Sequence, residues 1–320
     1  MLYPLKFRPI YKHYIWGGKK IADFKNIKSA KIISESWELS SVDGNISVVA
    51  NGFLAGNNLQ EIIEIYMGDL VGEKVYEKYG IEFPVLLKFI NAAQPLSVQV
   101  HPNDNIALQR HKAYGKEELW YVIDAEQNAE IFVGFNQKID EEKLIKSLQN
   151  KDLLDFLNSE KIQKGDVFEV PSGRVHAIGK GALIAEIQNT SDITYRIYDW
   201  GREHTPQARE MHINLALDVI DYDVCKSYKT NYAIEKNNVS ELCSNTHFNV
   251  SIIDANNVLI RDYSLVDSFV AYMCVDGKMC LECNGKTETL TQGETILIPA
   301  EIDEVKLIPK TNIRLLEISM

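Results

Sequence analysis

The strongest constraint on the fold of this chain is a pattern that occurs twice, in residues 165–176 and 293–304. Each copy starts with glycine, continues with five residues of strand-like composition, and reaches a proline, Pro171 or Pro299, before a turn. Glycine suits the turn that opens such a strand, and proline ends ladder pairing because it lacks a backbone donor. Two copies of one supersecondary unit predict two similar β-units in the chain.

The first copy matches G-x5-P-x-G-x2-H at every specified position, and this resembles the second sequence motif of the cupin fold. Gly173 can adopt the positive φ of a tight turn, which would direct His176 into a barrel. The second copy has Glu301 in place of the turn glycine and Glu304 in place of the histidine. The resemblance implies a mainly β chain with two cupin (jelly-roll) β-barrels, of which only the first can hold a metal.

Helical periodicity is limited to a few segments before residue 165. Apolar residues at helical spacing predict a helix over 59–70, with Asn58 as its N-cap. A short helix capped by Asp104 and reaching about Ala113, and a helical pair over 140–158, are also expected. The helices are therefore expected as insertions in or beside the N-terminal barrel.

Most of the remaining chain reads as strands and turns. A polar segment over 224–246, rich in Asn, Lys and Ser, is the best candidate for a connection between domains. We expect a catalytic, metal-binding cupin domain with helical insertions over 1–230. A metal-free, cupin-like barrel is expected over 231–320.

The stretch Leu96–Asp104 is the first candidate for metal binding. Gln99 and His101 lie two residues apart on a predicted strand, so their side chains project to the same face. By itself the stretch fits a polar sheet face equally well. Together with Glu118 and His176, however, it offers two imidazoles, a carboxylate and a carboxamide oxygen, with room for a substrate oxygen. Two histidines and a carboxylate can also hold iron, but this donor set without redox accessory residues favours one zinc ion per chain.

The other histidines and the cysteines receive structural interpretations. His111 lies near His101 and is expected beside the metal ligands or, more simply, at the surface. Cys280 and Cys283 are two packing thiols rather than half of a zinc site, because no second pair accompanies them. Loop, helix or metal-free contexts are expected for the remaining histidines, His13, His204, His212 and His247.

Composition restricts the partners. The 320 residues carry a net charge of −11, which argues against nucleic acid or an anionic membrane surface as a partner. No apolar run reaches the length of a membrane span, and the first residues lack the layout of a signal peptide. The cytoplasm is the expected compartment. A phosphate ester would need a local basic island, and nothing in the sequence predicts the oligomeric state.

Several separated segments carry a more specific resemblance. They are LSVQVHPND (96–104), GKEE (115–118), VPSGRVHA (170–177) and QNTSDITYRIYDWG (188–201), with WGG (16–18) and ESWELS (35–40). The chain resembles type I mannose-6-phosphate isomerases in their shorter bacterial form over most of residues 1–210. This implies zinc on the same four residues and an aldose–ketose isomerase that interconverts mannose 6-phosphate and fructose 6-phosphate through an enediol.

The resemblance also implies catalytic roles for Arg196, Lys116 and Glu186. Arg196 stays cationic and is expected to stabilise the enediolate oxygen or to bind the phosphate bidentately. Substrate binding is expected to involve Ser97 as well, with Lys116 and Lys88 completing the basic island for the phosphate.

Two groups are candidates for the general base. Glu186 needs a partly desolvated pocket for a useful pKa, and hydroxide held by the metal is the competitor. The chain also departs from longer family members, which have a tyrosine at the position of Ile178. The hydrogen bond of that tyrosine is therefore absent here.

Three alternative functions are compatible with parts of the pattern. One is a different metal-dependent cupin enzyme, such as an epimerase or a dioxygenase. Another is an isomerase of a different phosphosugar in the same pocket. The third is a non-catalytic sugar-binding cupin, which the ligand set and Arg196 disfavour because a binder needs no open Lewis acid.

Overall fold

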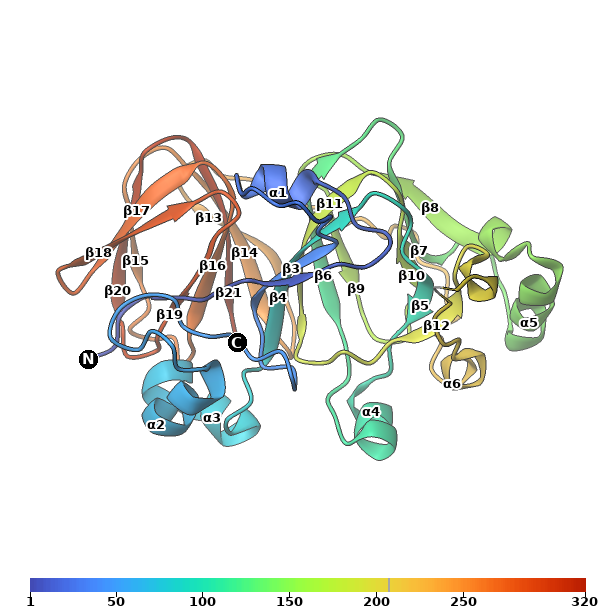
Figure 1. Ribbon diagram of the computed structural model, residues 1–320, viewed down its shortest axis with the longest axis horizontal. Coiled ribbons are helices and arrows are strands. Elements are labelled where there is room, and N and C mark those ends of the chain that lie inside the picture. Colours follow the sequence, from blue (N-terminus) through green and yellow to red (C-terminus); the bar gives the residue numbers. More distant parts are fainter. Residues whose placement is uncertain (207) are drawn as a thin grey trace.

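The computed structural model describes residues 1–206 and 208–320, and its strands form four antiparallel sheets (Figure 1). The first unit contains a six-stranded sheet in the order β2 (Ile10–Lys12), β3 (Glu35–Leu39), β4 (Val85–Ala92), β11 (Ala182–Asn189), β6 (Glu118–Ala125) and β9 (Val167–Val170). Its five-stranded partner has the order β12 (Tyr195–Tyr198), β5 (Val98–Val100), β10 (His176–Ile178), β7 (Glu130–Phe135) and β8 (Leu157–Lys161).

The second unit lies beside the first and also contains two sheets (Figure 1). Its six-stranded sheet has the order β1 (Leu5–Lys6), β19 (Thr295–Ile298), β16 (Val270–Asp276), β21 (Ile313–Ser319), β14 (Asn249–Ala255) and β13 (Val239–Ser244). Its four-stranded sheet has the order β15 (Leu259–Asp262), β20 (Glu304–Pro309), β17 (Lys278–Cys283) and β18 (Lys286–Thr291). The predicted mainly β class with two β-units is confirmed.

The largest hydrophobic cluster joins the two units. It contains Leu87 and Phe89 from β4, and Met273 and Leu316 from β16 and β21. Side chains in a strand alternate between faces, so the β4 residues next to Leu87 and Phe89 in the sequence face the interior of the first unit. Both faces of the six-stranded sheets are therefore covered, and apolar burial across them stabilises the assembly at about 25 cal/mol per Å².

The strands of the repeated pattern occupy matching places in the two units. β9 ends at Val170 before Pro171, and β19 ends at Ile298 before Pro299. Gly173 has φ +85°, so the positive φ expected of this turn is confirmed. His176 opens β10 and is buried, whereas Glu304 opens β20 and is exposed. The repeat thus gives the same order of strand, proline, turn and strand with different chemistry.

The helices lie at the edges of these sheets (Figure 1). In the first half of the chain they are α1 (Lys20–Phe24), α2 (Leu59–Val71), α3 (Glu73–Tyr79) and α4 (Asp104–His111). They are followed by α5 (Glu141–Asn150), the 3₁₀ turns η1 (Leu153–Phe156) and η2 (Arg202–His204), and α6 (Ile213–Leu217). The capping box at the start of α2 is confirmed, because Asn58 and Glu61 each accept a backbone hydrogen bond from the other.

Three local predictions are wrong. The N-cap of α4 is Asn103, whose side-chain oxygen accepts from the backbone of Ile106, while Asp104 instead accepts from Gly115. That helix ends at His111 rather than near Ala113. The second member of the expected pair over 140–158 is only a 3₁₀ turn, after which the chain enters β8. The short helices α1, α3 and α6 lack a strong apolar period and were not expected.

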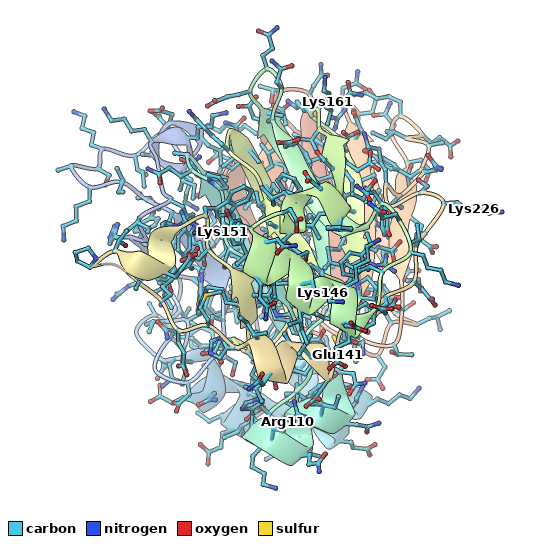
Figure 2. All side chains as sticks on the ribbon, turned by 90° about the vertical axis from the view of Figure 1, so that its right-hand side faces the viewer. Arg110, Glu141, Lys146, Lys151, Lys161 and Lys226 are labelled. Atoms are coloured by element: carbon cyan, nitrogen blue, oxygen red, sulfur yellow. The ribbon has the colours of Figure 1, made fainter. Side chains whose placement is uncertain are left out.

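The end of the first unit that carries α4 and α5 is strongly charged (Figure 2). The labelled side chains there are all exposed: Arg110, Glu141, Lys146, Lys151, Lys161 and Lys226. Leu144 on α5 points away from the solvent and packs against the outer face of the five-stranded sheet. No helix in the described part of the chain is long and apolar enough to cross a lipid bilayer.

Candidate active site

A cavity of about 380 Å³ opens between the two sheets of the first unit. Its wall combines three of the four predicted metal ligands, Gln99, Glu118 and His176, with Arg196 and Glu186. The other predicted site residues in this wall are Ser97, Lys88 and Lys116. Residues from six strands that are distant in the sequence therefore meet in one place.

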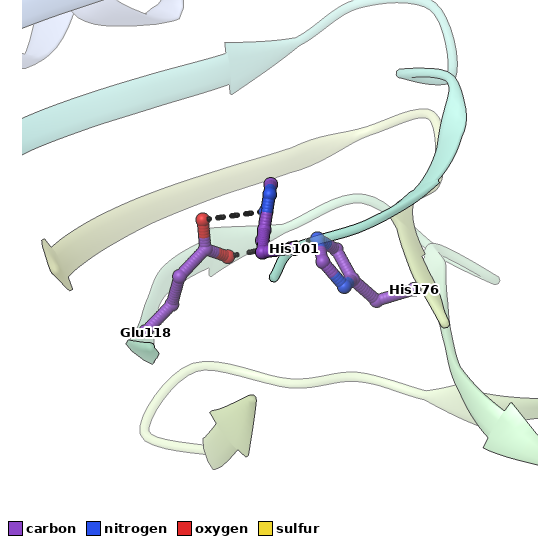
Figure 3. Close-up of side chains that lie close together, drawn as sticks. All are labelled: His101, Glu118 and His176. Carbon is purple, nitrogen blue, oxygen red and sulfur yellow. Dashed lines mark ion pairs between the residues drawn. The ribbon is translucent and has the colours of Figure 1, made fainter. Parts of the chain in front are cut away.

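His101, Glu118 and His176 form a compact buried group (Figure 3). One potential ligand atom of each lies within 4.8 Å of those of the other two. Nε2 of His101 is 3.2 Å from Glu118 Oε1, and Nε2 of His176 is 3.7 Å from Glu118 Oε2. Among the described residues, this is the one group of His, Cys, Asp or Glu side chains with such spacing.

Backbone carbonyls fix both imidazole rings. Nδ1 of His101 lies 2.8 Å from the carbonyl oxygen of Ile193, and Nδ1 of His176 lies 2.8 Å from that of Arg174. Each Nδ1–H donates to its carbonyl, so the lone pair of each Nε2 is available to a metal. The turn after β9 helps to position this pair, because the backbone N–H of Gly173 donates to the carbonyl of His101.

The protonation states also suit a cation. Burial, and then the charge of Lys116, lowers the pKa of His101 to about 3, and burial lowers the pKa of His176. Burial opposes ionisation of Glu118, but Lys116 and His101 outweigh it and hold its pKa well below the usual range. Two neutral imidazoles and one carboxylate are the forms that bind zinc.

Gln99 completes this group from the middle of its sheet. It pairs in register with His176 on one side and with Arg196 on the other. Its Nε2 is 3.2 Å from His176 Nε2, and its Oε1 accepts from the Ser97 hydroxyl at 3.2 Å. A half-turn of the amide exchanges these atoms, bringing Oε1 to the imidazole side, and the hydroxyl can accept as well as donate.

The residues present fit a metal ion. His101 Nε2 is buried and makes no hydrogen bond, which is costly for a polar atom unless another partner binds there. Two imidazole nitrogens and a carboxylate lie close enough to bind one ion, and the amide of Gln99 lies beside them, next to the cavity. This set of donors fits a metal ion held next to the cavity.

A buried ion pair lies next to the His101–Glu118–His176 group. Lys88 and Glu186 are register partners on β4 and β11, and Nζ lies 2.7 Å from Oε1. Trp120 donates from Nε1 to Glu186 Oε2 at 2.8 Å and to Glu118 Oε2 at 3.0 Å. One indole therefore connects the metal-ligand carboxylate to the second carboxylate of the cavity.

The two partners of this ion pair respond differently to burial. Burial, and then the charge of Glu118, raises the pKa of Glu186. Burial lowers the pKa of Lys88, but Glu186 and Glu35 outweigh it, so the net shift is upward. Glu186 thus has the desolvated surroundings expected of a general base.

Lys116 contacts the His101–Glu118–His176 group directly, whereas Arg196 contacts residues beside it. Nζ of Lys116 lies 2.9 Å from Glu118 Oε1, and the residue is buried rather than at the surface. Arg196 donates from Nε to the Ser97 hydroxyl at 3.1 Å and from Nη1 to the carbonyl of Glu210 at 2.7 Å. Burial, and then the nearby Arg209, lowers the pKa of Arg196 to about 10, so the guanidinium remains charged at neutral pH.

The histidines outside the group lie in other surroundings. His111 contacts the Tyr195 hydroxyl at 2.7 Å and His13 is exposed near the carbonyl of Ile32. His212 accepts from the backbone N–H of Arg196, and His247 contacts Asn189 of the first unit. The side chain of His204 lies outside the described residues. Cys280 and Cys283 are three residues apart on β17 and therefore lie on opposite faces.

Sequence reasoning missed Trp120 and Arg209. Trp120 lies two residues after Glu118 on the same strand, so alternation alone puts it on the ligand face, and that signal was available. Arg209 follows the last recognised motif by eight residues and reaches the cavity through a non-local contact. No local pattern identifies such a residue.

Comparison with known proteins agrees with this geometry. The family model for the phosphomannose isomerase type I catalytic domain matches residues 4–151, and the model for the mannose-6-phosphate isomerase cupin domain matches residues 238–315. The chain is 32% identical over 317 residues to mannose-6-phosphate isomerase ManA of Bacillus subtilis, covering 95% of each chain. The chain belongs to the type I phosphomannose isomerases. It is thus an isomerase, and the predicted family is confirmed.

Further relatives of this isomerase support the assignment. The mannose-6-phosphate isomerase of Streptococcus mutans is 37% identical over 222 residues, which cover 69% of this chain and 68% of the relative. The crystal structure of the Bacillus subtilis enzyme superposes with a TM-score of 0.88 at 29% identity, covering 100% of both chains. Phosphomannose isomerase from Salmonella typhimurium, in its apo form, shares the fold at 18% identity and a TM-score of 0.79.

Proposed function

We propose that this isomerase interconverts mannose 6-phosphate and fructose 6-phosphate in a zinc-dependent reaction through an enediol. The observation that carries the proposal is the proximity of two groups in one cavity. One is the buried His101–Glu118–His176 group, and the other is the Lys88–Glu186 ion pair, joined to it through Trp120. An aldose–ketose isomerase needs both an electrophile at the substrate oxygens and a base near C1 and C2.

Gln99, His101, Glu118 and His176 would hold one zinc ion per chain. Bound zinc supplies Lewis acidity toward the carbonyl and hydroxyl oxygens of the sugar. The carbonyls that bind both Nδ1 atoms keep the imidazoles oriented for this role. Ser97 would keep the Gln99 amide in place, because its hydroxyl bonds that amide.

Glu186 is the proposed general base. Its carboxylate would take the proton from C2 of the aldose and return it to C1 of the enediol, while a proton passes from the hydroxyl at O2 to O1, which yields the ketose. Lys88 holds this carboxylate at 2.7 Å, and Trp120 holds its other oxygen. Two fixed contacts restrict the carboxylate to one orientation, and general-base catalysis depends on such positioning.

The cationic residues would stabilise the substrate. Arg196 donates hydrogen bonds in a rigid fork, which suits the enediolate oxygen or the phosphate. Lys116 contacts Glu118 and would balance negative charge beside the reacting carbons. Lys88 and Lys116 would thereby contribute to substrate binding through the electrostatic potential of the cavity.

Catalysis is assigned to residues 1–230, apart from β1, which pairs within the second unit, and residues 231–320 are assigned a metal-free supporting role. The absence of a second group resembling His101–Glu118–His176 in the described residues supports this division. All five cysteines are free, which agrees with a reducing compartment such as the cytoplasm.

A coupled assay of both reaction directions tests the function. Zinc-loaded enzyme is expected to convert mannose 6-phosphate to fructose 6-phosphate, to lose turnover after treatment with chelator, and to regain it when zinc is added. Normal turnover by metal-free protein would refute zinc dependence. No conversion by zinc-loaded protein would refute the assignment of substrate.

An isotope experiment tests the enediol. When the reaction runs in D₂O, deuterium is expected at C1 of fructose 6-phosphate, because the base exchanges its proton with solvent. Product without deuterium throughout the time course would indicate direct hydride transfer between the carbons. Glu186→Gln enzyme serves as the comparison. The substitution removes the proposed base but leaves the zinc ligands in place, so turnover is expected to be slow.

A further inference from the structure

A second arginine lines the cavity and has no assigned role. Arg209 follows η2, and its guanidinium lies over the ring of Trp16 with a distance of 4.6 Å from Cζ to the ring centroid. Asp199 binds it through two contacts, from Nη2 to Oδ1 at 2.6 Å and from Nε to Oδ2 at 3.2 Å. Asp199 itself is completely buried. The guanidinium is therefore held at a fixed point of the cavity wall.

This region has an excess of positive charge. Arg196, Arg202 and Arg209 lie around the single buried carboxylate of Asp199, and the carboxylate of Glu210 is 83% exposed. Asp199 balances only one of these three positive charges, so the region keeps a net positive charge that favours binding of a further anion. The excess therefore indicates a binding place for a ligand of negative charge.

Several donors in this part of the wall also lack acceptors. In the described part of the chain, Nη2 of Arg196 and Nη1 of Arg209 make no hydrogen bond. The indole Nε1 of Trp16, which lines the same cavity, is buried and without an acceptor. A buried donor without an acceptor, such as Nε1 of Trp16, is uncommon in folded proteins and suggests a ligand that supplies oxygen atoms. The two guanidinium N–H groups are partly accessible and can donate to the same ligand.

The lysines of the cavity are less suited to bind a phosphate directly. Lys88 is engaged by Glu186 at 2.7 Å, and Lys116 by Glu118 at 2.9 Å. Both ion pairs are buried, so recruiting either ammonium group would leave a buried carboxylate without its partner. The two arginines have free N–H groups, whereas the two lysines already have carboxylate partners.

We infer that Arg209, together with Arg196, binds the phosphate group of the substrate. The reacting end of the sugar would then lie toward the His101–Glu118–His176 group, because the Arg196 side chain bonds Ser97 and the carbonyl of Glu210 rather than any of those three residues. Guanidinium groups bind phosphate bidentately, and two of them fix its orientation as well as its position. This inference rests on the proposed function, since it assigns one end of that substrate.

Arg202 provides a matched control. It binds the same Asp199 carboxylate, at 2.7 Å, and also the carbonyl of Pro95, but it does not line the cavity. Arg209→Gln and Arg202→Gln therefore each remove one guanidinium from Asp199, and only the first removes a proposed phosphate contact. Comparison of the two separates phosphate binding from support of the loop.

The experiment measures steady-state kinetics with mannose 6-phosphate and the binding of inorganic phosphate to zinc-loaded protein by calorimetry. Arg209→Gln is expected to raise both KM and the Kd for phosphate by about 10- to 100-fold, as the loss of a charged hydrogen bond predicts. Its kcat should change by less than about threefold, because the phosphate is remote from the reacting carbons. Arg202→Gln is expected to leave the phosphate Kd within about twofold of that of the unaltered enzyme.

Unchanged KM and phosphate Kd in Arg209→Gln would overturn the inference. An equal loss in Arg202→Gln would also overturn it, because the effect would then belong to Asp199. If Arg209→Gln does not fold, Arg209→Lys replaces it: a weakened phosphate Kd supports the inference and an unchanged one overturns it. Phosphate binding is measured without turnover, so an enzyme inactive on mannose 6-phosphate would refute the proposed function while the test of Arg209 remains decisive.

Discussion

Lys88 and Glu186 face each other across neighbouring strands, with Nζ 2.7 Å from Oε1 in the interior of the first unit. The same row across the sheet continues to Trp37 on one side and Trp120 on the other. Aromatic side chains thus flank a charged pair on both sides and keep it out of water. This relationship carries the first prediction.

Glu186→Gln is expected to lower kcat by about 10²-fold or more, because the amide cannot accept the substrate proton. The zinc content should remain that of the unaltered enzyme, since Glu186 lies outside the ligand group. Turnover and metal content are measured on the same preparation. A kcat within about threefold of the original would assign the base to another group.

His101→Ala is expected to lose zinc and activity together, because it removes a ligand at the centre of the buried group. His13→Ala is the matched control, since His13 is exposed and has no role in the proposed reaction. Metal analysis after dialysis should give about one zinc per chain for the control and close to none for His101→Ala. Zinc retained at full content by His101→Ala would contradict the ligand assignment.

Arg196→Ala is expected to reduce kcat/KM by about 10²-fold, mainly through KM, while zinc content stays unchanged, as loss of a charged contact to the substrate phosphate predicts. The side chain contacts Ser97 and the carbonyl of Glu210 but none of the three ligands His101, Glu118 and His176. Steady-state kinetics together with metal analysis check both parts. Full activity in this variant would exclude a role at the substrate.

The Lys25–Glu38 ion pair makes a testable contribution to stability. The two side chains are only 6% and 3% exposed and lie 2.6 Å apart, and Lys25 also donates to the carbonyl of Gly293 in the second unit. Lys25→Met leaves a buried carboxylate alone and should cost about 3–5 kcal/mol of unfolding free energy. Denaturant unfolding measures the loss, and Lys25→Met/Glu38→Gln should recover most of it.

The loss in Lys25→Met should depend on pH. Burial raises the pKa of Glu38, and Lys25 opposes that shift in the unaltered protein. Without Lys25, the folded pKa lies further above the unfolded value, so the penalty is small below the unfolded pKa and grows as pH rises from it to the folded pKa. The deficit at pH 5 should therefore be smaller than at pH 8. An equal deficit at both would contradict the assignment to Glu38.

Cys283→Ser is expected to leave the zinc content unchanged. Cys283 is buried in the core of the second unit, and Cys280 lies on the other face of the strand. A zinc content lower by one ion per chain would indicate that Cys283 is part of a zinc site after all. Serine at this place should cost stability, because a hydroxyl is buried without an assured acceptor.

The sequence was sufficient where the relevant signal is local. Alternation put Gln99 and His101 on one face, and the pattern from Gly165 to His176 predicted a strand, a turn with positive φ and a buried histidine. The cap of α2 follows the same logic, since Asn58 and Glu61 are three residues apart. Each of these features depends on a few neighbouring residues.

Contacts between segments distant in the chain could not be predicted from the sequence. Nothing near residue 88 or 186 reveals that these two side chains share a register, which depends on the pairing of β4 with β11. The same holds for Arg209, whose partners Asp199 and Trp16 meet it only in the folded chain. The N-cap of α4 was missed for a smaller reason, since Asn103 and Asp104 are adjacent and both can accept.

Strand β1 has a consequence for the order in which the molecule can be completed during synthesis. Leu5 pairs with Leu297, so an edge of the six-stranded sheet in the second unit comes from the opposite end of the chain. At about 5–20 residues per second, a ribosome takes roughly 15–60 s to travel between them. Throughout that interval the apolar side chains around Leu5 have no sheet to pair with. In a nascent chain that stalls before residue 297, these side chains stay exposed and accessible to chaperones.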